Sequence, residues 1–232
     1  MGKTHRKKRR LTQRPRQKRI RKYRKIGILV LATIFAVLVC AKYISPLLAH
    51  DEYTENNSET IDALRPDIDV QLLTVNPYSR PGTETNKITG IVVHYTANPG
   101  STAMDNRNYF EGLKDSHETK ASSNFVIGLD GEIVQCVPTW EVAYASNSRN
   151  IDTVSIECCH PDETGKFTDA TYRSMVKLCA WLCVKFDLNS ENVIRHYDVT
   201  GKNCPKYFVE NEEAFWTFRS DIEQAIQNTP VE

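Results

Sequence analysis

The sequence contains little glycine and proline, ten of each among 232 residues, and no internal repeat is visible. These low counts exclude collagen-like chains and Pro/Gly-rich low-complexity chains. Ten tyrosines, eight phenylalanines, three tryptophans and a hydrophobic fraction of 40% exclude a wholly disordered chain. The length then fits one domain of ordinary size with extensions.

Acidic residues are absent from the first 25 positions, which carry fourteen Lys and Arg. The remaining residues carry 29 Asp and Glu against sixteen Lys and Arg, so a tail of +14 precedes a body of −13. The formal total of +1 conceals this division. A charge asymmetry of this size predicts that the two parts face different surroundings.

Charged residues are also missing from the sixteen positions of Ile26–Ala41, and Ile44–Ala49 extends this apolar run past Lys42 and Tyr43. A helix that spans a bilayer needs about 20 apolar residues, and a lysine near its end can extend to the headgroups. Residues 26–49 are therefore predicted to form one transmembrane anchor. A cleaved signal peptide is the alternative, because it also combines a basic start with an apolar core.

The basic tail, residues 1–25, has two readings. Its cations could bind nucleic-acid phosphates, or they could hold the N-terminus in the cytoplasm by the positive-inside rule. The adjacent apolar run favours the second, and the acidic body has no basic aromatic strip for nucleic acid. We therefore expect a single-pass membrane protein with residues 50–232 outside the cytoplasm, or a secreted protein if the signal is cleaved.

The part after the apolar run divides into a polar stalk, residues 50–86, and a domain, residues 87–232. The stalk carries three prolines and little periodicity. In the domain, Asp130-Gly131 predicts a hairpin turn. Strands and helices intermix, so the class is α/β or α+β with one sheet. The expected strands are 88–95, 124–129, 132–137, 153–159 and 192–197. The expected helices are 104–113, 168–186 and 211–226, and Thr168 and Asn211 are the candidate caps of the last two.

Three residues of metal-ligand type stand at the ends of predicted strands or just beyond them. His94 ends the first strand, His196 ends the last strand, and Cys204 follows eight residues later. Two imidazoles and a thiolate suit Zn²⁺ and leave a fourth position open for water. A lone histidine on a strand is more often a packing or surface residue. The spacing alone therefore indicates a metal site only moderately.

Glu157 and Lys202 are the candidate catalytic residues. Glu157 lies between Ile156 and Cys158 in an otherwise apolar strand, where a carboxylate is costly to bury. It would act as a general base, or it would simply face solvent on the exposed side of the strand. Lys202 would stabilise an oxyanion, or it would be an ordinary solvated lysine.

Four runs together carry a resemblance: IVVHYTANPG, SSNFVIGLDGEIVQCVP, NIDTVSIECCHPDETGKF and VIRHYDVTGKNCP. They resemble, in order, the zinc-dependent N-acetylmuramoyl-L-alanine amidases of the amidase-2 family, which is related to the peptidoglycan recognition proteins. The resemblance spans about residues 73–218. It implies a central mixed β-sheet flanked by helices, a Zn²⁺ ion in a peptidoglycan-binding groove, and cleavage of the amide between N-acetylmuramic acid and L-alanine.

The resemblance also implies roles for single residues. The family's three metal ligands fall on His94, His196 and Cys204, its conserved lysine on Lys202, and the glutamate of its I-E motif on Glu157. Three positions depart from relatives. Ser123 stands where many relatives have a catalytic tyrosine, and both Asn124 and Ala145 stand where some have histidine. The departure at Ser123 moves the role of general base to Glu157, whereas the departure at Ala145 concerns contacts with the substrate.

Three other functions remain as alternatives. A non-catalytic peptidoglycan receptor on the same fold is disfavoured by the complete ligand set. A nucleic-acid binder is disfavoured by the acidic body, and another zinc hydrolase by the lack of an H-E-x-x-H sequence. The sequence does not specify the oligomeric state.

Five further cysteines lie on predicted strands or on the buried side of a helix. We expect them to be free and buried, although one disulfide between the strand pair and the helix pair would be compatible. They are Cys136, Cys158, Cys159, Cys179 and Cys183.

Overall fold

The computed structural model describes residues 64–228 together with Tyr23, Ile28, Val30, Thr33, Ile34 and Lys42. The predicted anchor, residues 26–49, lies almost wholly outside the described residues, as does the basic tail. Among the residues that are described, none of the helices has the length and apolar character that a membrane crossing requires.

A six-stranded mixed sheet forms the centre of the domain, with the strand order β1-β4-β3-β5-β2-β6. Only β3 and β4 pair antiparallel, and the other neighbours run parallel. The predicted hairpin around Asp130-Gly131 is this antiparallel pair. The strands are β1 (Asp69–Val70), β2 (Gly90–Tyr95), β3 (Phe125–Ile127), β4 (Ile133–Gln135), β5 (Thr153–Cys158) and β6 (Val193–Arg195).

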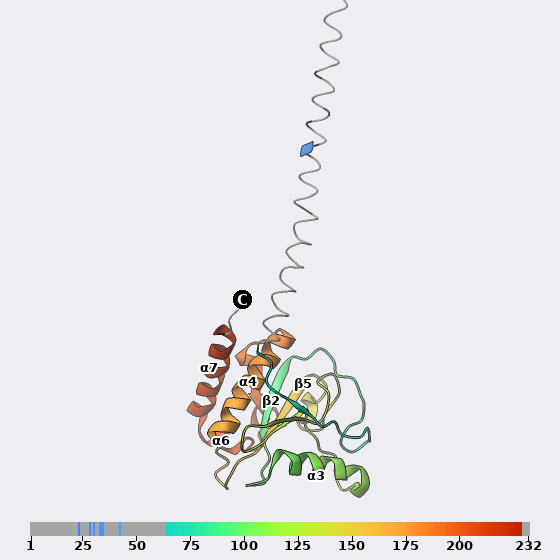
Figure 1. Cartoon of the computed structure of the whole chain (residues 1–232), viewed down its shortest axis with the longest axis vertical. Coiled ribbons are helices and arrows are strands. Elements are labelled where there is room, and N and C mark those ends of the chain that lie inside the picture. Colours follow the sequence, from blue (N-terminus) through green and yellow to red (C-terminus); the bar gives the residue numbers. More distant parts are fainter. Residues whose placement is uncertain are drawn as a thin grey trace, which may run out of the picture. The chain divides into compact units, whose positions relative to one another are not determined.

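Helices cover both faces of the sheet (Figure 1). Helix α3 (Ala103–Ser116) contacts β3 and β4, whereas α4 (Asp169–Phe186) contacts β2 and β3 and packs against α7 (Glu212–Gln227). The short elements are η2 (Asn147–Arg149), η3 (Ser190–Asn192), α5 (His196–Thr200) and α6 (Lys206–Glu210). This arrangement confirms the predicted central mixed sheet with flanking helices.

The strand sequences explain why there are two cores. Successive residues of a strand point to opposite faces. On β3, Phe125 and Ile127 belong to the core under α4 and α7, while Val126 belongs to the core under α3. On β5, Ile156 and Cys158 belong to the α4 core, so Glu157 between them faces the α3 side.

Local capping sets the start of both long helices. The Thr102 hydroxyl accepts a hydrogen bond from the Asp105 amide, and the Asp105 carboxylate accepts one from the Thr102 amide. Thr168 caps α4 through the Thr171 amide, as the sequence predicts. Asn211 is the N-cap residue of α7, as the sequence predicts, but its side-chain amide donates to the Tyr207 carbonyl and makes no cap hydrogen bond.

The predicted stalk needs correction over residues 64–86. Strand β1 pairs with β4, Leu73 is 1% exposed, and the Arg80 guanidinium contacts the Glu141 carboxylate at 2.7 Å. This segment is therefore part of the folded domain, because its few apolar residues add a strand to the edge of the sheet. Residues 50–63 lie outside the described residues.

A second correction concerns the end of the last strand. Strand β6 stops at Arg195, and His196 is the first residue of α5. The Asp198 carboxylate accepts a hydrogen bond from the Arg195 amide, and Gly201 ends the helix in the left-handed region. The five cysteines other than Cys204 agree with the preferred prediction, since all five are free and buried.

Candidate metal centre and active site

The site begins at the C-terminal end of β2, where His94 follows Val93. Val93 belongs to the core under α4, so His94 points to the opposite face of the sheet. The residue is 2% exposed. The buried imidazole therefore lies on the α3 side of the sheet, beside Glu157 on β5.

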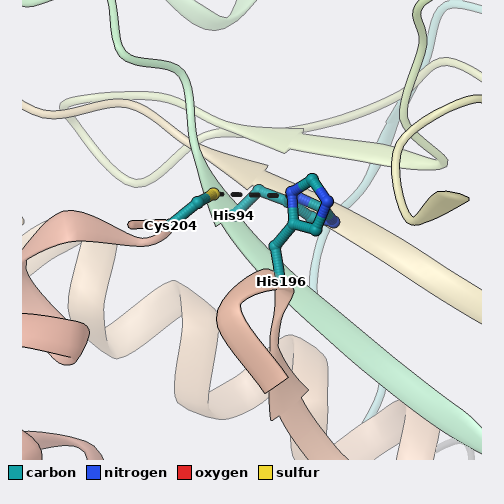
Figure 2. A group of neighbouring side chains, drawn as sticks. All are labelled: His94, His196 and Cys204. Carbon is teal, nitrogen blue, oxygen red and sulfur yellow. Dashed lines mark hydrogen bonds between the residues drawn. The ribbon is translucent and has the colours of Figure 1, made fainter. Parts of the chain in front are cut away.

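His196 and Cys204 come to His94 from one connected segment. Strand β6 pairs with β2, and α5 starts directly after it, so His196 stands beside His94. The Tyr197 amide donates to the Cys204 carbonyl at 2.9 Å, which returns the chain to the same place. The ligand atoms of all three residues lie within 4.8 Å of one another (Figure 2).

The geometry inside this cluster is close. The Cys204 Sγ atom lies 3.8 Å from the His94 Nδ1 atom, and the two imidazole centroids are 4.7 Å apart. His196 is 6% exposed and Cys204 is 3% exposed. Polar groups that are buried to this degree need hydrogen-bond or metal partners.

Two neighbouring residues hold the far sides of the imidazoles. The His94 Nε2 atom lies 3.1 Å from the Ser146 hydroxyl, and the His196 Nε2 atom lies 2.8 Å from the Asn147 side-chain oxygen. With a proton on each Nε2 atom, each Nδ1 atom keeps its lone pair for a metal. Ser146 and Asn147 are not among the site residues that the sequence predicts, although the polar run from Ser146 to Asn150 indicates a loop whose side chains form hydrogen bonds.

Protonation in the cluster follows from burial. Burial, together with the nearby charges of His196 and Lys202, lowers the pKa of His94 well below its usual value. Burial and Lys202 also lower the pKa of His196. Both rings are therefore neutral near pH 7, which is the form that binds metal. Burial, together with the charge of Glu157, raises the pKa of the Cys204 thiol to about 12, against the opposing charge of Lys202.

The donor set fits Zn²⁺. A tetrahedral zinc ion with bonds of about 2.0–2.3 Å keeps its donor atoms roughly 3.5 Å apart, close to the observed separation of Cys204 and His94. A metal bound to sulfur also removes the thiol proton. His94, His196 and Cys204 are the residues that would hold the ion, and three protein donors leave one position open.

Glu157 lies against this cluster on the neighbouring strand. His94 and Glu157 are register partners in the β2–β5 pair, and the His94 Nδ1 atom is 4.0 Å from the Glu157 Oε1 atom. The side chain is 19% exposed, but its Oε2 atom is buried without a hydrogen-bond partner among the described residues. Burial raises the pKa of Glu157 to about 8, against the opposing charge of Lys202. Burial alone therefore favours the protonated carboxyl near neutral pH, and a cation held in the cluster would favour the carboxylate that a general base requires.

Lys202 lies in the loop between α5 and α6 and is exposed. Its positive charge lowers the pKa values of His94, His196 and Glu157, so its ammonium group acts on the whole cluster. An exposed ammonium at the rim of a buried site can meet negative charge that develops on a bound molecule.

A cavity of about 420 Å³ opens beside Glu157. Helix α3 supplies one wall, including Asn106 and Tyr109, and the chain after β2 supplies another, including Thr96. The Thr96 hydroxyl is buried and has no hydrogen-bond partner among the described residues. The cavity therefore brings two unsatisfied polar atoms, one each from Thr96 and Glu157, to one place.

The three positions that depart from relatives have local structural roles. The Ser123 hydroxyl donates to the Phe125 carbonyl at 2.9 Å, and the Asn124 side chain binds Ser155 and the Pro138 carbonyl. The Ala145 amide donates to the Asn150 side chain. Ser123 and Asn124 are fully enclosed and belong to the support of the sheet, so neither offers a group to the site.

Comparison with protein families gives one match. Residues 84–207, more than half of the chain, match the amidase-2 family, described as N-acetylmuramoyl-L-alanine amidase. The chain is 33% identical over 169 residues to the N-acetylmuramoyl-L-alanine amidase CwlL of Bacillus licheniformis and 29% identical over 178 residues to the N-acetylmuramoyl-L-alanine amidase BlyA of Bacillus subtilis. Both alignments cover 68% of this chain and 47% of the relative, so the chain spans about half the length of the curated relatives it matches.

Solved structures show the same fold. A mutant endolysin from Bacillus subtilis has a TM-score of 0.58 at 26% identity, with 68% of this chain and 99% of that chain covered. PlyL has a TM-score of 0.58 at 22% identity, with coverages of 68% and 98%. At the lower identity, the likeness to PlyL concerns the fold alone.

Proposed function

The chain belongs to the amidase-2 family of N-acetylmuramoyl-L-alanine amidases, and we propose that its domain, residues 87–232, is a zinc-dependent peptidoglycan hydrolase. The bond cleaved is the amide between the lactyl group of N-acetylmuramic acid and L-alanine of the stem peptide. The observation that carries the proposal is the buried cluster of His94, His196 and Cys204 with Glu157 beside it. A receptor that only binds peptidoglycan would have no need of this arrangement.

A zinc ion held there would supply a Lewis acid and lower the pKa of a bound water. Glu157 takes a proton from the attacking water and returns it to the nitrogen of L-alanine as the amide bond breaks. Lys202 faces the negative charge that develops on the lactyl oxygen. Ser146 and Asn147 keep the two imidazoles in place throughout.

The test combines metal analysis with digestion of purified cell wall by the full chain in detergent. We expect about one zinc per chain and new L-alanine amino termini without new reducing sugars. A His94→Ala variant serves as the inactive control. New reducing ends without new amino termini would contradict the proposal, and binding of wall without cleavage would favour the non-catalytic receptor.

For the location of the protein we propose a single-pass anchor at residues 26–49, with the basic tail in the cytoplasm and the domain outside. The support is the division of charge and the apolar run in the sequence. The tail would also attract anionic lipids. A protease added to intact spheroplasts should digest the domain and leave a membrane-bound fragment of the tail and anchor. Recovery of the domain without residues 26–49 in the medium would favour the cleaved signal peptide.

A further inference from the structure

A second groove, of about 340 Å³, lies at the opposite side of the sheet from the metal ligands. Its walls come from the segment around β1 and from the C-terminal half of α4. Strand β4, next to β1, is separated from β2 by β3 and β5, so three strand spacings, about 14 Å, lie between β4 and the strand that carries His94. The two cavities share no lining residue.

The floor and rim of this groove are apolar and aromatic. Val70 is 53% exposed, Leu72 is 38% exposed and Trp140 is 64% exposed, and all three line the groove. Exposed large apolar side chains that gather in one hollow indicate a binding surface. A flat indole of this exposure offers a face to an apolar ring surface.

Trp181 adds a polar group. Its side chain lines the groove from α4 and is 6% exposed, and its indole N–H has no hydrogen-bond acceptor among the described residues. Buried polar groups of proteins nearly always have a partner. The unsatisfied N–H lies behind the surface of the groove, so a ligand oxygen would reach it only after the wall of the groove shifts.

The charge of the groove is opposite to that of the body. Arg65 and Lys185 line it, and no Asp or Glu does, although the chain beyond residue 25 carries a net charge of −13. Alternation along the extended chain turns Ile68, Val70 and Leu72 toward the groove and Asp69 away from it. Lys185 also lies over the Trp181 ring, 5.0 Å from its centroid. The ligand should therefore combine ring faces, hydrogen-bond acceptors and negative charge.

We propose that this groove binds the peptide-free glycan strand that the reaction leaves behind. The inference rests on the proposed function. Hydrolysis breaks the carbon–nitrogen bond, adds the water oxygen to the lactyl carbon and gives the proton to the L-alanine nitrogen. Each muramic acid then carries an ionised carboxylate where an uncharged amide stood. The product strand is thus an anionic chain of sugar rings, which matches Trp140, Trp181, Arg65 and Lys185.

The binding experiment uses a synthetic tetrasaccharide of alternating N-acetylglucosamine and N-acetylmuramic acid with free lactyl carboxylates. Its partner probe carries lactyl carboxamides instead and differs only in charge. The full chain is labelled with ¹⁵N-tryptophan in detergent, so that its three tryptophans give three indole signals. We expect the acid to shift the signals of Trp140 and Trp181 and to leave that of Trp216, and to bind at least fivefold more tightly than the carboxamide.

Variants then locate the site. Trp140→Ala should weaken binding at least tenfold, and Lys185→Gln should remove the preference for the acid. The control is Trp216→Ala, an exposed tryptophan on α7 that lies outside the groove and should bind as the unchanged chain does. Equal binding of the two probes, or full binding by Trp140→Ala, would overturn the proposal.

The outcome is separable from that of the amidase test, because the probes are made without the enzyme. Binding in a chain that does not cleave cell wall would retain the groove and reject the proposed function. Cleavage without binding of the acid would retain the function and reject the groove.

Discussion

His94 and Glu157 face each other across the parallel strands β2 and β5, with the His94 Nδ1 atom 4.0 Å from the Glu157 Oε1 atom. The same register pairs Val93 with Ile156 in the core under α4. Because side chains alternate along a strand, the packing of the apolar pair fixes the face on which the polar pair meets. A shift of one residue in the β2–β5 register would turn the site residues into the core. It would disrupt both the apolar pair and the polar pair.

Removal of the proton-transfer group tests the role of Glu157. Glu157→Gln should lower amidase activity by about 10²–10⁴-fold, since the amide cannot accept the proton of water. Bound zinc should stay unchanged, because Glu157 is not a ligand. Activity is measured as released L-alanine amino termini, and zinc by elemental analysis. Retention of full activity would remove Glu157 from the mechanism.

Replacement of the thiol tests the third metal ligand. Cys204→Ser should lose most of its zinc, because a serine hydroxyl seldom ionises to bind metal. Cys183→Ser is the matched control, since Cys183 is also buried but donates to the Asn189 carbonyl on another part of the fold. Zinc is measured after dialysis against a weak chelator. Equal zinc in both variants would place Cys204 outside the site.

Substitution of Asn147 tests whether its hydrogen bond orients the His196 imidazole. The residue adopts the left-handed region with φ of 53°, so Asn147→Gly removes the side chain without straining the backbone. Loss of this partner should lower zinc affinity by about 10–100-fold. Ser148→Ala, an exposed neighbour on η2, should leave the affinity unchanged. Zinc affinity is measured by competition with a fluorescent chelator. An unchanged affinity in Asn147→Gly would show that the hydrogen bond with Asn147 does not orient the His196 ring.

Glu111 links α3 to the segment after β1. Burial opposes its ionisation, but hydrogen bonds from Thr74 and Lys114 and the charge of Arg107 outweigh burial and lower the pKa of Glu111 to about 2. Because the folded-state pKa is depressed, this stability is present above about pH 4.5 and is lost as the pH falls toward 2. It amounts to on the order of 2 kcal/mol.

The measurement is urea unfolding at pH 7 and pH 3 with a chelator present, so that metal release does not contribute. Glu111→Gln should unfold at lower urea than the unchanged chain at pH 7, and the difference should shrink at pH 3. Glu163→Gln, an exposed position, is the control. A difference that is the same at both pH values would contradict the assignment.

Leu73 tests whether residues 64–86 belong to the domain. The side chain is 1% exposed and packs in the core under α3, so Leu73→Ala should lower the free energy of unfolding by about 2–4 kcal/mol. Leu72 is 38% exposed, and Leu72→Ala should cost less than about 1 kcal/mol. Equal stability of Leu73→Ala and Leu72→Ala would indicate that residues 64–86 are a spacer and not part of the folded domain.

Local features of the sequence predicted much of the fold. Thr168 and the apolar stripe after it gave the start and end of α4, because capping and helical periodicity act within a few residues. Strand β1 was missed because Asp69–Val70 has only two residues and is stabilised by pairing with β4, more than 60 positions away. The helix His196–Thr200 was missed for a different reason: its five residues are too few to show a helical pattern of apolar side chains, although its first turn is capped locally by the Arg195–Asp198 contact.

The sequence by itself determined which residues have the chemistry of the site: His94, His196, Cys204, Glu157 and Lys202. It also determined the family, because the motifs stand in a particular order. Only the tertiary structure decided how these residues meet, since β2, β5 and β6 are distant in the chain and their register is set by packing against α4 and α7. The hydrogen bonds of Ser146 and Asn147 with the two imidazoles likewise exist only in the folded chain. The same holds for the cationic groove, whose walls come from separate segments of an acidic body.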